Sequence, residues 1–131
     1  MRQERVFIPW EGPSLNKIWA GMHWAKRKDI ADTGHRACLV ARGLKPFIGA
    51  VKITFQPVAG PRKRRYDCCN YALTNKVIVD GLVRMKVLTD DWIDNVKGTE
   101  TLAAVRGERS GTWVTITEIG DDGAGHDERQ A

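Results

Sequence analysis

The sequence predicts a small α+β domain in which a mixed or antiparallel sheet of about four strands packs against two helices. The chain has 131 residues, which suits a single domain. Apolar residues make up 42% of it, enough to build a hydrophobic core and to exclude a wholly disordered chain. Segments with the two-residue period of strands are interspersed with segments that have the period of helices, which is typical of an α+β fold.

The first half of the chain contains two predicted strands and one predicted helix. Residues Arg5–Pro9 form a short apolar strand that its proline ends. After a polar, basic loop, a helix is expected over Thr33–Ala41, with Gly43 as its C-terminal stop. Apolar and polar side chains alternate in Ala50–Phe55, as in a half-buried strand, and Pro57 and then Gly60-Pro61 are expected to end it.

The second half contains a long predicted helix and two further strands. Apolar residues recur at three- and four-residue steps over Tyr71–Leu88, which predicts an amphipathic helix that Asn70 caps. The strands are expected over Val96–Ala104 and Thr112–Glu118, with a hairpin turn at Gly107–Gly111 between them.

Charge is distributed unevenly along the chain. Residues 1–65 contain 14 Lys and Arg against four Asp and Glu, whereas residues 66–131 contain seven against twelve. A basic half is suited to binding a polyanion, and an acidic half to supplying carboxylates. Residues 120–131 have no apolar periodicity and carry four acids, so we expect a folded domain over 1–119 and a disordered acidic tail over 120–131.

No membrane-spanning segment is expected, because no run of 18 apolar residues occurs. There is no signal-peptide pattern, and the three cysteines do not form a disulfide framework, so a cytoplasmic location is expected. Histidine and cysteine spacings match no zinc site. Trp10, Trp19 and Trp24 either belong to the core or stack on unpaired bases, whereas Trp92 and Trp113 are expected in the core.

A run of four cations precedes the long helix. Such a run neutralises DNA or RNA phosphates and releases their condensed counterions. The alternative is a solvated charged loop, but here the run follows an already basic half of the chain, which favours nucleic-acid contact. The candidate DNA-binding residues are Lys17, Lys26, Arg27, Lys28, Arg62, Lys63, Arg64 and Arg65.

Acidic residues flank the same helix, and phosphodiester hydrolysis needs carboxylates that share a divalent cation. Asp67 lies before the helix and Asp90-Asp91 after it. A straight helix of this length would hold its ends roughly 27 Å apart. One metal site therefore requires that the helix ends or breaks near Gly81, that the Asp90-Asp91 loop folds back, or that a second subunit completes the site. The plain alternative is that Asp90-Asp91 only forms a turn.

Lys76 precedes Asp80 by four residues and Cys69 precedes Lys76 by seven, so the three can share one face of the helix. A lysine there can bind the scissile phosphate or stabilise its developing charge. By spacing alone, an ordinary surface Lys–Asp pair is the better interpretation.

Several of these features occur together in a fixed order. Arg-Lys-Arg-Arg-Tyr-Asp67-Cys-Cys-Asn70 is followed by Lys76-x-x-x-Asp80-Gly-Leu and then by Leu-Thr-Asp90-Asp91. This motif resembles that of the RusA-type Holliday junction resolvases (crossover junction endodeoxyribonucleases) of phages and prophages. The segments Ile8-Pro-Trp-x-x-Pro-Ser-x-Asn and Val114-Thr-Ile-Thr-Glu resemble the family's first and last strands, so the resemblance extends to about Gly120.

The resemblance implies a Mg²⁺-dependent homodimer that cuts four-way DNA junctions symmetrically in the cytoplasm of a bacterium or a phage-infected host. By position, Asp67, Lys76, Asp90 and Asp91 match the catalytic residues, and the three carboxylates match the metal ligands. Asn70 and Asp80 match further motif positions. A C₂ dimer would supply the two equivalent sites that paired cuts need.

Cys69 stands where the family has its second motif aspartate, and Met85-Lys86 stands where its members often have glycine. A thiol of pKa near 8.5 is mostly neutral at pH 7 and, as a soft ligand, suits Mg²⁺ poorly. Three hypotheses remain: a junction-resolving nuclease, a junction- or nucleic-acid-binding protein that cleaves weakly or not at all because of Cys69, and a basic RNA-binding domain without catalysis.

Overall fold

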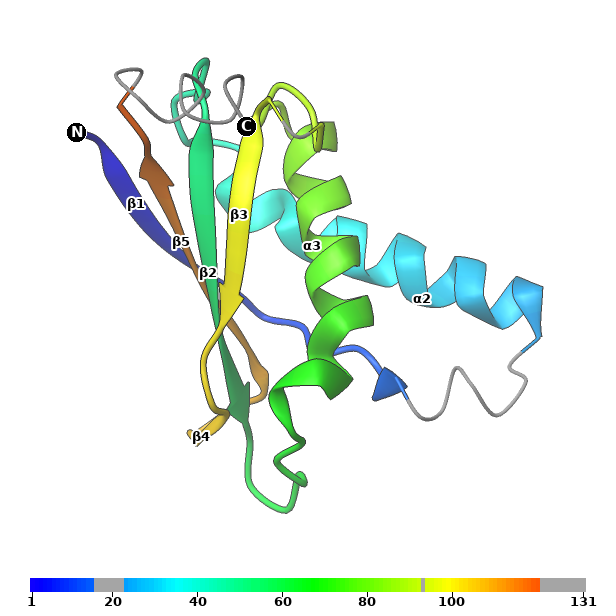
Figure 1. Ribbon diagram of the computed structural model, residues 1–131. Coiled ribbons are helices and arrows are strands. Elements are labelled where there is room, and N and C mark those ends of the chain that lie inside the picture. The colour runs from blue at the N-terminus through cyan, green and yellow to red at the C-terminus, as the bar shows by residue number, and fades with distance from the viewer. Residues whose placement is uncertain (16–22, 93, 121–131) are drawn as a thin grey trace, which may run out of the picture.

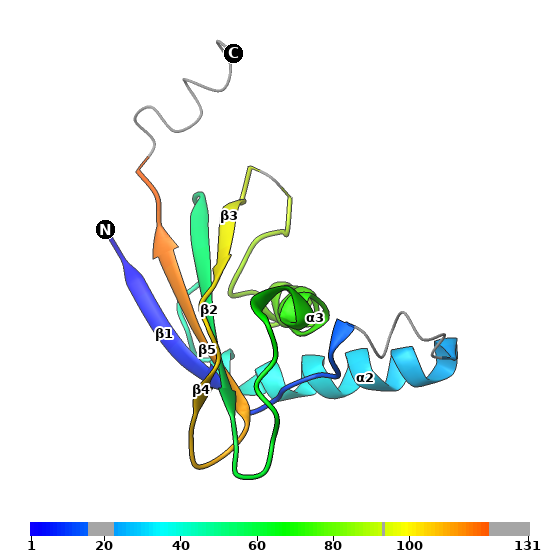
Figure 2. The same cartoon turned by 60° about the horizontal axis from the view of Figure 1, so that its bottom comes forward.

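A mixed sheet forms one layer of the molecule, and two helices form the other (Figures 1 and 2). The computed structural model describes residues 1–15, 23–92 and 94–120. This architecture confirms the predicted small α+β fold. The elements, in chain order, are β1 (Gln3–Ile8), α2 (Trp24–Ala37), the 3₁₀ turn η1 (Cys38–Ala41), β2 (Val51–Ala59), the 3₁₀ turn η2 (Cys68–Tyr71), α3 (Ala72–Arg84), β3 (Val96–Thr101), β4 (Val105–Arg106) and β5 (Gly111–Glu118).

The strands lie in the order β1-β5-β2-β3, and the short β4 also pairs with β2. The β1–β5 and β5–β2 pairs are antiparallel, whereas β3 and β4 run parallel to β2. Side chains alternate across the sheet. Ile53 and Phe55 of β2 and Val114 and Ile116 of β5 are completely buried against the helices, while their neighbours on the opposite face are not.

Strand β2 passes through Pro57, which the sequence had predicted to end it. Phe55 and Ala59 accept hydrogen bonds from Leu102 and Gly107 on the β3–β4 side. Pro57 lies between these two acceptors, so its missing N–H faces the gap between β3 and β4. The proline therefore costs the sheet no ladder hydrogen bond.

The predicted strand over Val96–Ala104 is shorter than expected, because β3 ends at Thr101. The prediction of a hairpin turn at Gly107–Gly111 is wrong. Strands β4 and β5 pair with opposite edges of β2, so this segment crosses over the end of β2 instead of joining two adjacent strands.

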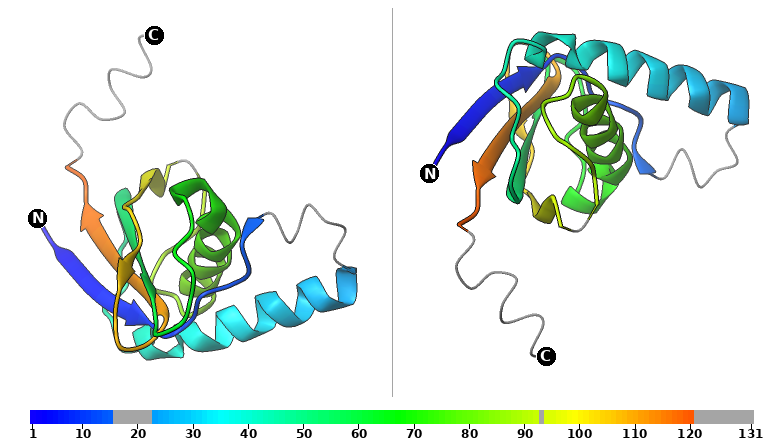
Figure 3. Two further views of the ribbon diagram at one scale, coloured as in Figure 1. Left: turned by 90° about the horizontal axis from the view of Figure 1, so that it is seen from below. Right: turned by 90° about the horizontal axis from the view of Figure 1, so that it is seen from above.

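The first predicted helix is wrong in its extent, since α2 begins nine residues earlier, at Trp24. The ring of His23 caps it by accepting a hydrogen bond from the Ala25 N–H (3.2 Å). Residues 24–29 are exposed on all sides, and Figure 3 shows this part of α2 extending beyond the rest of the molecule. A helical segment without a packing partner has no apolar periodicity, which is why the sequence did not indicate it.

The second predicted helix also differs at both ends. Its first turn is the 3₁₀ turn η2, and α3 starts after Tyr71, so Asn70 lies within η2 and does not cap α3. Its C-terminal end is at Arg84, not at Leu88. Lys86 has a φ of 62°, which no α-helix accommodates, and the chain reverses there.

The described tryptophans differ in how deeply they are buried. Trp10 packs against the core, whereas Trp24 is exposed and Trp19 lies outside the described residues. The predictions for Trp92 and Trp113 are wrong. Trp92 is 62% exposed, and Trp113 lies half-buried on the sheet face opposite the helices. Among the residues described, no helix is long and apolar enough to span a membrane.

Glycines allow α2 and α3 to cross closely. A Cβ atom at Gly81 would lie 2.5 Å from Cys38 Sγ and 3.0 Å from Cys38 Cβ, and one at Gly34 would lie 2.5 Å from a methyl group of Val77. Both glycines are buried in the contact between the helices.

Gly81→Ala is expected to lower the free energy of unfolding by about 1–3 kcal/mol, because the added methyl overpacks this contact. Alanine's higher helix propensity offsets part of that loss. Urea unfolding measures the change. Gly43→Ala is the matched control, since nothing lies within 4 Å of its added methyl, and a change of less than about 0.5 kcal/mol is expected there. Equal stability of the two variants would contradict this helix contact.

Candidate active site

A cleft of about 510 Å³ opens between α3 and β3. The start of α3 and the preceding turn contribute Cys68, Cys69 and Lys76 to its wall, and the loop after the helix contributes Asp91. Four segments that are separate in the sequence meet here: β2, the η2–α3 segment, the loop after α3, and β3. The remaining lining residues are Phe55, Ala72, Asn75, Val79, Val96, Gly98, Thr99 and Thr101.

The chain after α3 folds back along the helix. Val87 and Leu88 are buried and both donate backbone hydrogen bonds to the carbonyl of Leu82 (3.0 and 3.3 Å). The N–H of Phe47 in turn donates to the carbonyl of Val87 (2.9 Å). These contacts fix the reversal at Lys86. The helix ends at Arg84, close to Gly81, and the loop after it folds back, so the first two of the three alternatives act together to bring Asp91 to the front half of the helix.

Asp91 consequently meets Lys76 in the cleft. Lys76 Nζ lies 3.1 Å from Asp91 Oδ2 and 3.2 Å from Asp80 Oδ1. Spacing alone favoured an ordinary surface pair of Lys76 with Asp80. The lysine does form that pair, and it also bonds to the carboxylate of Asp91, 15 residues away. Its side chain remains 62% exposed, so a phosphate in the cleft can reach it.

The two charges perturb one another. The hydrogen bond from Lys76 is the main cause that lowers the pKa of Asp91, with a smaller contribution from the Asp90 side chain. The bonds to Asp91 and then Asp80 raise the pKa of Lys76. Asp91 therefore stays ionised below the ordinary range of a carboxyl group, and Lys76 stays protonated above that of an amine.

Cys69 and Cys68 are exposed at the same cleft, whereas Cys38 is buried under α3, where burial raises the pKa of its thiol to about 12. Because the thiolate is the reactive form, an aromatic disulfide reagent at pH 8 is expected to label two thiols per chain rapidly. The third should react only after denaturation. Cys38→Ser is the control and should leave the rapid labelling unchanged. Three rapidly reacting thiols in the folded protein would contradict the burial of Cys38.

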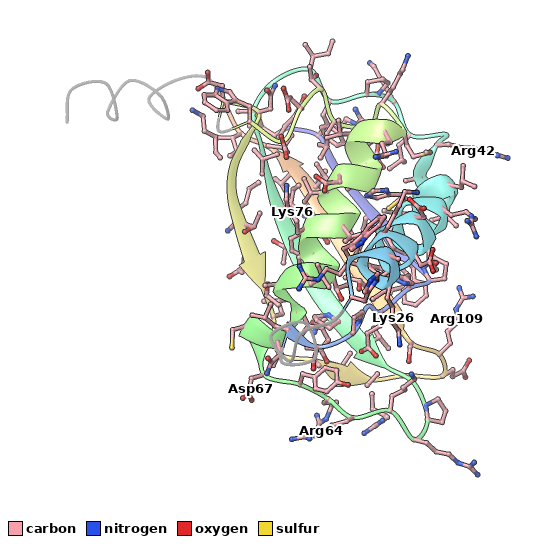
Figure 4. All side chains as sticks on the ribbon, turned by 90° about the vertical axis from the view of Figure 1, so that its right-hand side faces the viewer. Lys26, Arg42, Arg64, Asp67, Lys76 and Arg109 are labelled. Carbon is pink, nitrogen blue, oxygen red and sulfur yellow. The ribbon has the colours of Figure 1, made fainter. Side chains whose placement is uncertain are left out.

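Asp67 and Asp90 do not join Asp91 in this wall. Asp67 lines a neighbouring recess with Tyr66 and Cys68, beyond the N-terminal end of α3, and Figure 4 shows it below Lys76. The side chain of Asp90 is exposed and accepts a hydrogen bond from the N–H of Asp91 (2.7 Å). Among the residues described, no three Asp, Glu, His or Cys side chains are grouped closely enough to hold a metal ion.

Within the described ranges, the cleft thus does not provide a complete set of Mg²⁺ ligands. Within the cleft, Asp91 supplies a hard oxygen ligand, and the position beside it is a thiol, Cys69. Mg²⁺ favours oxygen over sulfur, so the cysteine does not complete the site.

The cations divide into two groups around the cleft. The loop after β2 exposes its four basic residues, Arg62 to Arg65, and Arg106 steadies its base by a 2.7 Å hydrogen bond to the carbonyl of Gly60. The second group is in the exposed N-terminal part of α2, residues 24–29, and consists of Lys26, Arg27 and Lys28. Figure 4 shows Arg64 below Asp67, and Lys26 above both of them at α2. Lys17 and the predicted tail lie outside the described residues.

The sequence interpretation did not identify Asn75 and Thr101. Asn75 Nδ2 donates to Thr101 Oγ1 (2.9 Å), which joins α3 to β3 across the cleft. The buried Asn75 Oδ1 has no hydrogen-bond partner in the described part of the chain. The sequence could have indicated Asn75 as a site residue, because it directly precedes Lys76. It does not distinguish Thr101 from the other threonines of the sheet.

Comparison of the chain with models of known protein families finds no match, and comparison with curated proteins finds none either. The resemblance to the RusA-type resolvases therefore rests on the ordered sequence motif.

Proposed function

We propose that the protein is a Mg²⁺-dependent, structure-specific endodeoxyribonuclease of the RusA type that resolves four-way DNA junctions by paired phosphodiester cleavage, acting as a homodimer. The observation that supports this most strongly is the ion pair of Asp91 with Lys76 in the cleft between α3 and β3 (3.1 Å). It unites two motif positions that are 15 residues apart in the sequence.

The roles follow from the chemistry of each group. Asp91 would be the ligand of Mg²⁺ in the cleft, and Asp67 and Asp90, which do not line it, would reach the ion through the waters that Mg²⁺ usually keeps. When bound, the ion would lower the pKa of a water molecule and polarise the phosphate. Lys76 contacts the scissile phosphate and stabilises its developing charge. Asp80 positions Lys76 from the neighbouring turn of α3. The basic residues of the β2–η2 loop and of α2 contact the DNA backbone.

A second candidate function is junction binding with little or no cleavage, and Cys69 favours it. The cleft has a thiol where the motif calls for a carboxylate, so the site holds one negative charge fewer and binds metal less well. Backbone binding would gain from the same change, because less negative charge repels the phosphates.

A cleavage assay separates these functions. The protein is incubated with a mobile synthetic four-way junction, or with a duplex of the same sequence, with and without Mg²⁺. Under the nuclease proposal, opposite strands of the junction are nicked in Mg²⁺ and the duplex is spared. Tight junction binding without nicking would establish the binding function instead. Equal affinity for junction, duplex and RNA at the same salt concentration would contradict both.

A further inference from the structure

The face of the sheet opposite the helices is open. In Figures 1 and 2 both helices lie on one side of the sheet, and no described element covers the other. This outer face, defined by the outward residues of β1, β5 and β2, is polar and aromatic rather than aliphatic. Its members are Gln3, Arg5, Phe7, Lys52, Thr54, Gln56, Trp113, Thr115 and Thr117.

Two arginines and two aromatic rings form one stack on the outer face. Phe7 and Trp113 are opposite each other on β1 and β5, and their rings meet edge to face with centroids 5.1 Å apart. The guanidinium of Arg5 lies 3.9 Å from the Trp113 ring centroid, and that of Arg109 lies 4.8 Å from the Phe7 centroid. The order of the stack, which runs along the β1–β5 pair, is therefore Arg5, Trp113, Phe7, Arg109.

The backbone is shaped to fit this stack. A Cβ atom at Gly111 would lie 2.3 Å from the ring of Phe7, so only glycine lets that ring lie across the start of β5. The rings in turn restrict the two guanidinium groups, which would otherwise be mobile at an exposed surface. A guanidinium stacked by its face keeps its planar N–H fork free to contact two oxygens of an anion such as a phosphate.

The two arginines have no anionic partner among the residues that the structure describes. In the described part of the chain, neither Arg5 nor Arg109 forms an ion pair with a carboxylate. The third cation of the face, Lys52, is paired with Glu100 at 3.8 Å. The outer face therefore presents two ordered, uncompensated positive charges at the stack.

We propose that the outer face binds the phosphate backbone of a second DNA arm, through Arg5 and Arg109 held against Trp113 and Phe7. The identity of the anion as DNA rests on the proposed function. The α3–β3 cleft lies on the helical side of the sheet, so one duplex arm cannot occupy both surfaces without passing around the sheet. The arms of a four-way junction diverge, and two of them can contact the two sides together.

Charge also selects against a second copy of this chain as the occupant. A twofold dimer through this face would bring the stack against its own copy and oppose like charges without a solvent shell. Phosphates instead neutralise both arginines and release condensed counterions.

The test measures binding rather than cleavage. The affinity of the full chain for a labelled four-way junction is determined without divalent metal, over a range of salt concentrations. Arg5→Gln/Arg109→Gln is expected to weaken binding about tenfold at 0.1 M salt and to reduce the log–log salt slope by about 0.9 for each lost contact. Arg5→Lys/Arg109→Lys retains charge without the fork and should give an intermediate loss. Thermal melting confirms that each variant is folded.

The matched control is Arg42→Gln/Lys45→Gln, which removes the same charge from two exposed residues after η1. It should change the affinity by less than about threefold. Equal losses in the two double variants would overturn the assignment, because net charge alone would explain them. Displacement of the junction by polyglutamate, with the same dependence on Arg5 and Arg109, would assign the face to an acidic protein and would also overturn it.

The outcome is independent of whether the protein cuts DNA. Normal nicking with unchanged binding by Arg5→Gln/Arg109→Gln would reject the outer face alone. Absent nicking with the expected loss of binding would reject the nuclease proposal and leave the outer face as a DNA surface.

Discussion

Cys69→Asp is expected to increase the rate of Mg²⁺-dependent junction nicking by roughly 100-fold, at the upper end of what even an outer-shell partner of a metal contributes. The substitution places a hard, ionised oxygen ligand in the cleft beside Lys76 and Asp91. The concentration of Mg²⁺ needed for half-maximal nicking should fall in parallel, because the site gains a negative charge. Nicking rates over a Mg²⁺ titration measure both effects.

Two neighbouring substitutions serve as controls for this experiment. Cys69→Ser removes the thiol without adding charge and should give no gain. Cys68→Asp adds the same charge one residue away, at a side chain that is also exposed, and its gain should be at least about tenfold smaller. Equal rates for Cys69→Asp and the wild type would show that Cys69 does not limit the reaction.

Lys76→Met should reduce nicking by roughly 10²- to 10³-fold, as removal of one donor to a transition-state oxyanion does. The same change removes the main cause of the lowered pKa of Asp91. That pKa should therefore rise toward the ordinary value, so that the carboxylate becomes protonated at a higher pH than in the wild type. A carboxyl-carbon NMR titration measures the shift separately from activity.

The control for Lys76→Met is Lys45→Met, which removes an exposed lysine that does not line the cleft. Nicking and the titration of Asp91 should both remain as in the wild type. If Lys76→Met left the pKa of Asp91 unchanged, the ion pair between α3 and the folded-back loop would not exist in solution. A pKa shift without loss of nicking would confine Lys76 to a structural role.

Local patterns were sufficient to predict most of the fold. β1, β2, α3 and β5 repeat apolar side chains at the period of their own geometry, because one face of each packs against the core. Residues 24–29, the N-terminal part of α2, are exposed and have no such signal. Pro57 misled the prediction, because whether a proline interrupts a strand depends on what lies opposite its nitrogen, and that is a property of the whole sheet.

Candidate residues for the site could be named from the sequence, but their arrangement could not be predicted. Asp91 meets Lys76 only because Lys86 takes a positive φ and Phe47, some 40 residues earlier, fixes Val87. That reversal could be posed as one of three alternatives, but no local pattern could select it. The stack on the outer face was even harder to predict from the sequence. Phe7 and Trp113 meet only through the register of β1 with β5, and Gly111 makes room for the ring of Phe7.

The most direct measurement is the nicking of a synthetic four-way junction in Mg²⁺ by the wild type and by Asp91→Asn, each assayed also with Cys69→Asp. Asparagine keeps the size of Asp91 and a hydrogen-bond acceptor for Lys76 but removes the charge. We expect paired nicks in opposite strands with the wild type, faster nicking with Cys69→Asp, and none whenever Asp91→Asn is present. Nicking that persists in Asp91→Asn, or its absence in both the wild type and Cys69→Asp, would contradict the assignment of the α3–β3 cleft as a junction-cleaving site.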